Sequence, residues 1–453
     1  MSNKAILHVG LVSLGCSKNL VDTQVMCGVL LTEGVELAPS PDEADVVLIN
    51  TCAFIQAARD EADAEIRRAI GLKRDGKIGA VVVAGCLPQR YGAGLAETYP
   101  EVDAWLGVDR LEEIADIVKR VGRQGRARKR ALVAVDAPAT CLFEPRVPSL
   151  SLAGGPFAYL KIAEGCSHAC AYCAIPGIRG RLRSRCVADI VEEAKVLRQV
   201  GVRELDIVAQ DVTAYGRDRR GAPRLPALLR ALDGLGGRYW TRILYGYPSL
   251  VDNALLEAFA SSKHLCRYID IPVQHSHPDI LRAMRRADTI PFVEALPERL
   301  RWACPGIAIR TTCLVGFPGE TEEHFRHLCD YVRQARFDAL GVFAFSCEEG
   351  TAAAAMEGQV PAEVAEARRD KLMRIQRRVQ RESRKARVGR KAQALLLRPA
   401  SGGRWEARTE WQAPDVDGVT LVSGCSPKAK TGDFVRVEIT GVRGYDFVAS
   451  VDC

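Results

Sequence analysis

The sequence lacks the two patterns that would direct a chain into or across a membrane. No apolar run reaches the roughly 18 residues that a membrane-spanning helix needs. Residues 1–6 (MSNKAI) also lack the charged and apolar pattern of a secretory signal peptide. We therefore expect a cytoplasmic protein without a membrane partner, whose 16 cysteines are reduced thiols, some of them metal ligands, and not a disulfide scaffold.

Charge gives little guidance about the partner. The net charge of +7 is compatible with binding to a nucleic acid or a ribosome, but many proteins with no such partner share it. The length of 453 residues and the hydrophobic fraction of 47% are sufficient for several buried cores. A chain of this length is expected to hold about three domains.

A fourth cysteine is missing from the most informative motif. Cys166, Cys170 and Cys173 are spaced C-x3-C-x2-C, and no further cysteine follows closely. Three thiolates can hold three irons of a cubane iron–sulfur cluster. The fourth iron is then open to a small molecule, as in a catalytic metal site. A zinc knuckle or three unrelated core cysteines are the alternatives.

Three other cysteines each end an apolar run. The runs at 6–14, 46–49 and 80–84 read as buried strands, and Cys16, Cys52 and Cys86 follow them with at most two residues in between. The cysteines are 36 and 34 residues apart, about the length of a βαβ unit. Since parallel strands place their carboxyl ends on one sheet edge, we expect these cysteines to converge. The alternative is three small apolar residues at strand ends.

Alternating strand and helix patterns resume after a linker rich in arginine and proline. The arginines of residues 122–130 indicate a solvated hinge or a contact to ribosomal RNA. About six βα units then predict an open, partial (β/α) barrel with its site at the carboxyl ends of the strands. The expected strands are residues 157–162, 204–209, 242–245, 268–271, 308–315 and 339–343.

The last 70 or so residues change to short β-like runs separated by Gly and Pro, which predicts a small antiparallel β-barrel. The overall fold class is therefore α/β: an N-terminal parallel α/β domain, a central partial barrel and a C-terminal β-barrel. The predicted boundaries are 5–121 for the first domain, 122–151 for the linker, 152–383 for the core and 384–453 for the terminal barrel.

Several polar groups or glycines follow predicted strands of the core and are candidates to touch a nucleoside cofactor. They are Gln210, Gln274, Gly316 and Gly319. Glycine in the GFPGE turn at 316–320 would let the backbone approach an adenine ring, although a simple tight turn explains it equally well. Arg179 and Arg181, just past the C-x3-C-x2-C motif, could meet a carboxylate or stay solvated.

Both cysteine triads, the core and the terminal barrel together resemble the radical S-adenosylmethionine methylthiotransferases over residues 5–453. The resemblance implies a TRAM domain at the C-terminus and two [4Fe–4S] clusters. The auxiliary cluster would be held by Cys16, Cys52 and Cys86, and the radical cluster by Cys166, Cys170 and Cys173. No further catalytic residue is assigned. Four stretches look like the RimO branch of the family: residues 209–216 (AQDVTAYG), 245–248 (YGYP), 270–275 (DIPVQH) and 413–418 (APDVDG).

That branch modifies an aspartate of ribosomal protein S-twelve. The resemblance implies that one S-adenosylmethionine supplies a methyl group to a sulfur on the auxiliary cluster. A second is split to a radical that removes a hydrogen from the aspartate β-carbon. The expected partners are S-twelve, within the small subunit, and a low-potential electron donor. Two alternatives stay open: methylthiolation of a modified adenosine in transfer RNA, and a non-catalytic metal scaffold that binds RNA.

Overall fold

Residues 6–124, 130–136, 139–142 and 154–452 are described by the computed structural model. They divide into two units. The first holds the described residues up to 152, with 163–168 and 173–185, and the second holds the remainder. Most of the predicted linker, with the arginines at 126 and 128, lies outside the described residues. None of the described helices has the length and apolarity that a membrane crossing requires.

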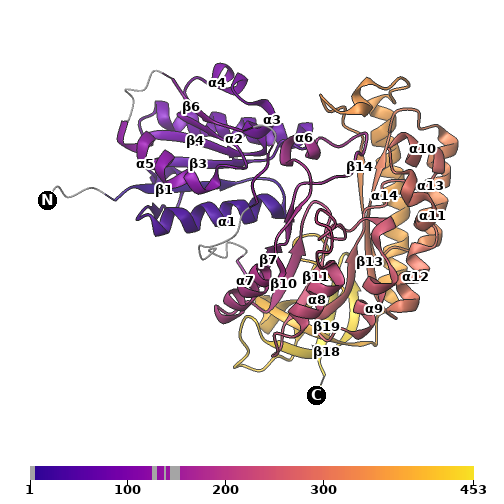
Figure 1. Ribbon diagram of the computed structural model, residues 1–453. Coiled ribbons are helices and arrows are strands. Elements are labelled where there is room, and N and C mark those ends of the chain that lie inside the picture. The colour runs from indigo at the N-terminus through magenta and orange to yellow at the C-terminus, as the bar shows by residue number, and fades with distance from the viewer. Residues whose placement is uncertain (1–5, 125–129, 137–138, 143–153, 453) are drawn as a thin grey trace. The chain divides into compact units, whose positions relative to one another are not determined.

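The first unit is built on a six-stranded parallel sheet (Figure 1). The sheet order is β2 (Glu36–Leu37), β1 (His8–Ser13), β3 (Val46–Thr51), β4 (Ala80–Gly85), β5 (Ala104–Leu106) and β6 (Leu132–Ala134). The connecting helices are α1 (Ser17–Thr32), α2 (Gln56–Arg74), α3 (Cys86–Tyr91), α4 (Gly94–Thr98) and α5 (Ile114–Gln124). The three predicted strands are confirmed as β1, β3 and β4, whereas the short β2, β5 and β6 were not foreseen.

Helices cover both faces of this sheet, which explains why its central strands are continuously apolar. Every residue of β3 and β4 is buried. Val47 and Ile49 pack in one hydrophobic cluster with α2, and Val46 and Leu48 pack in a second with α1 and α5. Burying each such side chain contributes roughly 1.5–3 kcal/mol.

The second unit contains the predicted partial barrel. Six parallel strands follow the order β14 (Ala339–Ala344), β13 (Ala308–Val315), β12 (Leu265–Asp270), β11 (Trp240–Ile243), β10 (Glu204–Val208) and β7 (Phe157–Lys161). Its helices are α7 (Val187–Gln199), α8 (Leu225–Asp233), α9 (Asn253–Ser261), α10 (Pro278–Ala283), α11 (Ile290–Val293), α12 (Leu296–Ala303), α13 (Glu322–Ala335) and α14 (Ala362–Lys385). The sheet has two edges, β14 and β7, so the barrel is open as predicted.

The same unit ends in a closed five-stranded barrel. Its strands are β15 (Lys391–Ala400), β16 (Arg404–Thr409), β17 (Thr420–Ser423), β19 (Asp446–Val451) and β18 (Phe434–Arg443). The barrel is antiparallel as predicted except for the pair β17 and β19, which is parallel. Strand β16 was not predicted, because its sequence RWEART is rich in charge.

Buried ions join the terminal barrel to the core. Glu204 on β10 accepts a hydrogen bond from Arg242 on β11 at 2.8 Å, and Arg408 on β16 pairs with it at 2.6 Å. All three side chains are at most 2% exposed. Burial opposes the charge of Glu204, but the two guanidinium groups lower its pKa. Asp206 lies beside them, and burial and Glu204 hold its pKa well above the ordinary value.

Replacing Arg408 by leucine should destabilise the second unit strongly, because Glu204 would lose one of its two countercharges in a dry interior. Breaking a buried pair costs about 3–5 kcal/mol in the free energy of unfolding. Urea unfolding followed by tryptophan fluorescence measures it. The matched control is Arg398→Leu in the same barrel, whose pair with Glu406 leaves the arginine 73% exposed. That change should cost at most about 1 kcal/mol; equal losses would contradict the structural role of the buried pair.

Candidate functional site

The three cysteines of the N-terminal sheet lie at the carboxyl ends of neighbouring strands. Cys52 and Cys86 directly follow β3 and β4, whose last residues, Thr51 and Gly85, are paired in register. Cys16 follows β1, the other neighbour of β3, and is the N-cap residue of α1. The sheet therefore brings the three residues to one edge, as the strand-end pattern predicted.

The turns at this edge are tightly packed. Gly15 has a φ of +90°, and a Cβ there would lie 2.6 Å from the Cβ of Cys52 and 3.2 Å from its Sγ. The backbone before Cys16 thus passes directly over Cys52. Only glycine combines this close approach with a left-handed φ at low cost.

The three thiols are free and differ in environment. Cys16 is exposed, whereas Cys52 and Cys86 are buried. Burial raises the pKa of Cys52 and raises that of Cys86 to about 12. Desolvation raises the pKa of the Cys16 thiol, but the charge of Lys18, the backbone N–H of Asn19 and the charge of Arg179 together lower it below its ordinary value. A soft metal must therefore displace protons from two buried thiols.

A buried arginine lies among these residues. Arg179, the last residue of α6 (Ile175–Arg179), donates from Nη2 to the Sγ of Cys86 at 3.2 Å and from Nη1 to Asp22 at 2.7 Å. The sequence left open whether Arg179 is solvated or meets a carboxylate, and the structure shows that it meets one. Nothing in the sequence marks it as buried, because arginine on a loop is usually exposed.

The C-x3-C-x2-C loop follows the first strand of the core, as predicted. Cys166, Cys170 and Cys173 are all partly buried. The N–H of Cys166 donates to the carbonyl of Gly180 at 3.0 Å, and the strands β8 (Ala163–Glu164) and β9 (Arg183–Ser184) pair beside it. A Cβ on Gly165 would lie 2.2 Å from the carbonyl oxygen of Arg181, so the two arms of the loop are in close contact.

The middle of this loop has separate partners. The N–H of Ala171 donates to the carbonyl of Met284, and the carbonyl of Ala171 accepts from Ala353. Arg286 is buried, and its Nη1 lies 3.8 Å from the Sγ of Cys170. Its guanidinium also stacks 4.2 Å from the ring centroid of Tyr247. Sequence reasoning missed Arg286, since nothing distinguishes it from the neighbouring Arg285.

The predicted cofactor-contacting residues lie at the carboxyl ends of the core strands. Gln210 follows β10, Gln274 follows β12, and Gly316 and Gly319 follow β13. Gln274 has a φ of +67°, an uncommon conformation for a residue other than glycine that often marks functional sites. Tyr245, after β11, has a φ of +64°. Their contact with a cofactor stays a prediction.

Packing explains one of these glycines. A Cβ on Gly316 would lie 2.3 Å from the Cβ of Ala365 on α14, so helix packing alone requires glycine here. A Cβ on Gly319, by contrast, would meet no heavy atom within 4 Å. Glu320 holds the turn by accepting a hydrogen bond from the N–H of Gly316 at 2.8 Å and pairing with Arg368 at 3.0 Å.

Outside the two cysteine triads, the ligand atoms of His277, Asp279 and His324 all lie within 4.8 Å of one another. Both imidazoles already accept backbone hydrogen bonds at their Nδ1 atoms. His277 accepts from Asp279, and His324 accepts from Thr321, each at 3.2 Å. They serve as helix caps, and we assign them no metal.

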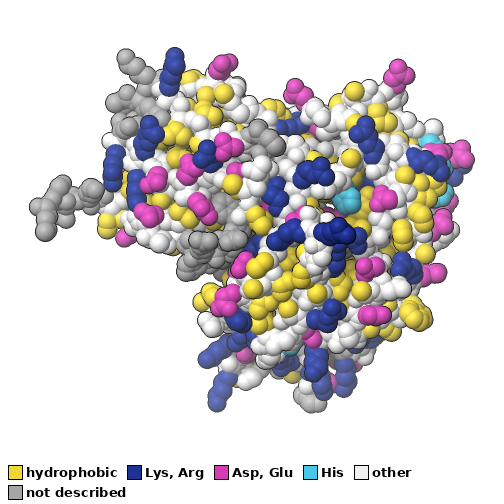
Figure 2. Space-filling model, viewed as in Figure 1, with side chains coloured by type: hydrophobic (Ala, Val, Ile, Leu, Met, Phe, Trp, Pro, Cys, Tyr) yellow, Lys and Arg dark blue, Asp and Glu magenta, His cyan; other side chains and the backbone are white. Residues whose placement is uncertain are grey.

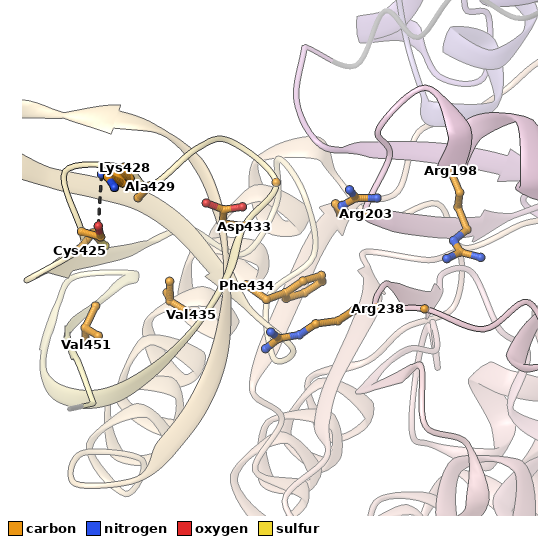
Figure 3. A pocket seen from close by; sticks show the side chains of 13 residues that line it. Arg198, Arg203, Arg238, Cys425, Lys428, Ala429, Asp433, Phe434, Val435 and Val451 are labelled. Carbon is orange, nitrogen blue, oxygen red and sulfur yellow. Dashed lines mark hydrogen bonds between the residues drawn. The ribbon is translucent and has the colours of Figure 1, made fainter.

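A cationic groove of about 740 Å³ lies in the second unit, between the core and the terminal barrel (Figure 3). Arg198, Arg203 and Arg238 line it from the core, and Lys428 and one carboxylate, Asp433, line it from the barrel. In the described part of the chain, no carboxylate forms an ion pair with any of these four cations. Figure 2 shows further Lys and Arg side chains gathered along the lower edge, over β18 and its neighbouring loops.

Three family models match the chain. Residues 8–107 match the uncharacterized protein family UPF0004, residues 160–332 the radical SAM superfamily and residues 388–451 the TRAM domain. These matches fall inside the three predicted domains, whose boundaries stay a prediction. Membership of the radical SAM superfamily implies a [4Fe–4S] cluster and S-adenosylmethionine.

Solved structures share the fold. The radical S-adenosylmethionine methyltransferase TsrM from Kitasatospora setae superposes with a TM-score of 0.52 at 18% identity, covering 75% of each chain. The cobalamin-dependent radical enzyme OxsB has a TM-score of 0.53 at 13% identity, covering 83% of this chain and 56% of its own.

Curated relatives are similar over nearly the whole length. The proteins of Pelotomaculum thermopropionicum and Syntrophus aciditrophicus are both 44% identical, covering 97% and 98% of this chain and 98% of their own. That of Trichlorobacter lovleyi is 42% identical over 100% of this chain and 99% of its own. All three are named ribosomal protein uS12 methylthiotransferase RimO, and none is named for transfer RNA. The chain therefore belongs to the RimO family of radical SAM methylthiotransferases.

Proposed function

We propose that this chain transfers a methylthio group to the β-carbon of an aspartate in ribosomal protein uS12, using S-adenosylmethionine and two [4Fe–4S] clusters. The observation that carries the proposal is the second set of thiols. A radical enzyme needs one cluster, and the gathering of Cys16, Cys52 and Cys86 at one sheet edge supports another. The uS12 substrate rests on the names of the relatives.

The donor atoms suit iron–sulfur clusters. Each site offers three cysteine sulfurs and no disulfide, and soft thiolate ligands select such clusters. In this proposal Cys16, Cys52 and Cys86 hold the auxiliary cluster, and Cys166, Cys170 and Cys173 hold the radical cluster. When bound, the radical cluster supplies the electron that splits S-adenosylmethionine.

The chain's own residues would position the cofactor. The strand ends that carry Gln210, Gln274 and Gly319 belong to one parallel sheet, whose carboxyl edge is where ligands bind in such folds. Gln274 offers an amide on a backbone held in place by hydrogen bonds with Thr312 and Leu314. Gly319 offers open space beside its backbone. Gly316 would contribute through its backbone alone.

The cationic groove supports a partner that presents nucleic acid, as the small ribosomal subunit does. The groove is lined by four cations and one carboxylate, so it favours binding to a partner whose surface is rich in phosphate. Arg238 stacks 4.9 Å from the ring centroid of Phe434, so its charge is held at the rim of the groove (Figure 3). The proposal also includes a low-potential electron donor and a cytoplasmic location.

Single cysteine variants should separate the two clusters. Cys170→Ala should abolish 5′-deoxyadenosine formation, because the radical cluster would lose a ligand. Cys52→Ala should still form 5′-deoxyadenosine but should transfer no methylthio group. Iron after anaerobic reconstitution should fall from about eight per chain to about four in each variant. Chromatography of the nucleoside, mass spectrometry of uS12 and iron analysis measure these outcomes.

Cys329→Ala is the matched control, because Cys329 is a buried free thiol on α13, outside both triads. It should keep both activities and all the iron. Release of 5′-deoxyadenosine by Cys170→Ala at the parental rate would show that the radical cluster is misassigned. A protein that binds iron but never cleaves S-adenosylmethionine would instead be a scaffold.

Deleting the gene should remove the methylthio group from uS12 and leave transfer RNA unchanged. Mass spectrometry of uS12 and of nucleosides from total transfer RNA, in deletion and complemented strains, tests this expectation. A methylthio nucleoside that disappears while uS12 keeps its modification would overturn the ribosomal substrate in favour of transfer RNA.

A further inference from the structure

Arg179 is a charged residue whose side chain is buried. It lies six residues after Cys173, at the end of a short helix, yet its side chain is only 3% exposed. Burying a guanidinium group is costly unless it is paired and hydrogen-bonded. Its partners come from α1, β8 and α3, three segments that are far apart in the sequence.

The guanidinium holds two carboxylates and one candidate cluster ligand. Nη1 donates to Asp22 at 2.7 Å and to Glu164 at 3.3 Å. Nη2 donates to Asn19 Oδ1 at 2.5 Å and to Cys86 Sγ at 3.2 Å. The two carboxylates already satisfy the positive charge. The contact with Cys86 is therefore additional and aims one N–H at a candidate cluster sulfur.

The side chain of Asn19 links Arg179 to the turns that carry Cys16 and Cys52. Its Nδ2 donates to the carbonyls of Leu14 and Thr51, at 3.1 and 2.8 Å, just before Cys16 and Cys52 in the chain. Its Oδ1 faces Arg179, which fixes the orientation of the amide. One arginine and one asparagine thus connect the turns that carry all three thiols.

Arg179 also lies beside the base of the C-x3-C-x2-C loop, where β8 pairs with β9; we call this base the stem. The carbonyl of the next residue, Gly180, accepts the N–H of Cys166, and the carbonyl of Arg179 accepts from Arg183. Glu164, which pairs with Arg179, lies two residues before Cys166. The backbone on both sides of this stem is therefore tied to Arg179.

We propose that Arg179 is a positioning residue for the auxiliary cluster, which orients the Cys86 sulfur and raises the cluster's reduction potential. This inference rests on the proposed assignment of Cys16, Cys52 and Cys86. A hydrogen bond and a positive charge beside a ligand sulfur stabilise the more negative, reduced state of a cluster. Arg179 supplies both, and it also holds Asn19 in place.

The test uses the full chain with Cys166, Cys170 and Cys173 replaced by alanine, so that only the auxiliary cluster can form. Arg179→Gln should shift the reduction potential to a more negative value, as measured by a redox titration followed by electron paramagnetic resonance. Iron loss to a chelator should be faster, because the sulfur is no longer held. Arg179→Lys keeps the charge without the planar fork, so its potential should lie closer to the parent while iron loss is still accelerated.

Arg181→Gln is the matched control. Arg181 is an exposed arginine two residues further along the same segment, and its replacement should change neither quantity. An Arg179→Gln protein that binds a cluster with the parental potential and the parental rate of iron loss would overturn the role of Arg179. If that variant binds no cluster, a parental potential and parental iron loss in Arg179→Lys would overturn it. Failure of the triple-alanine parent itself to bind about four irons would instead overturn the auxiliary cluster assignment.

Discussion

Parallel strand pairing is the constraint on which both candidate sites depend. Each parallel strand must return by a crossover, so successive strands end at the same sheet edge, about 35 residues apart in the chain. In the first unit this geometry gathers Cys16, Cys52 and Cys86, whose strands β1, β3 and β4 are direct neighbours. In the core it places Gln210, Gln274 and the turn at 316–319 at one edge. The parallel pairing of the strands is therefore enough to bring residues that are distant in the sequence to the same sheet edge.

Buried arginine side chains then contact the cysteines that the strand topology brings together. Arg179 connects the turns that carry Cys52 and Cys86, and Arg286 lies between Cys170 of the C-x3-C-x2-C loop and Tyr247, which follows β11. Each cysteine triad thus has one buried guanidinium beside a sulfur. Arginine suits this position because it is always charged and presents several N–H groups in a fixed plane. The same residue type therefore sets the electrostatics of two sites in different folds.

Much of the fold could be predicted because apolar runs mark buried parallel strands. Residues 308–315 were predicted as a strand and form β13 with those bounds, and β3, β4, β10 and β14 end within two residues of their predictions. Strand β16 was missed because charged residues dominate it, and Arg408 is buried only by virtue of Glu204. Arg179 and Arg286 could not be recognised for the same reason: the burial of a charge depends on partners distant in sequence. The role of Gly316 was equally hidden, since Ala365 lies almost 50 residues away.

The buried pair of Glu204 and Arg408 has a consequence for how such proteins can evolve. A terminal barrel that binds a macromolecule looks like a module that gene fusion could exchange between relatives. In this chain its removal would leave Glu204 and Asp206 in the core interior with Arg242 as their one remaining guanidinium partner. Exchange of the barrel between families would therefore cost stability unless the incoming barrel carries an arginine at the same depth or the core acidic residues change with it. We therefore expect the terminal barrel and the core to be inherited together.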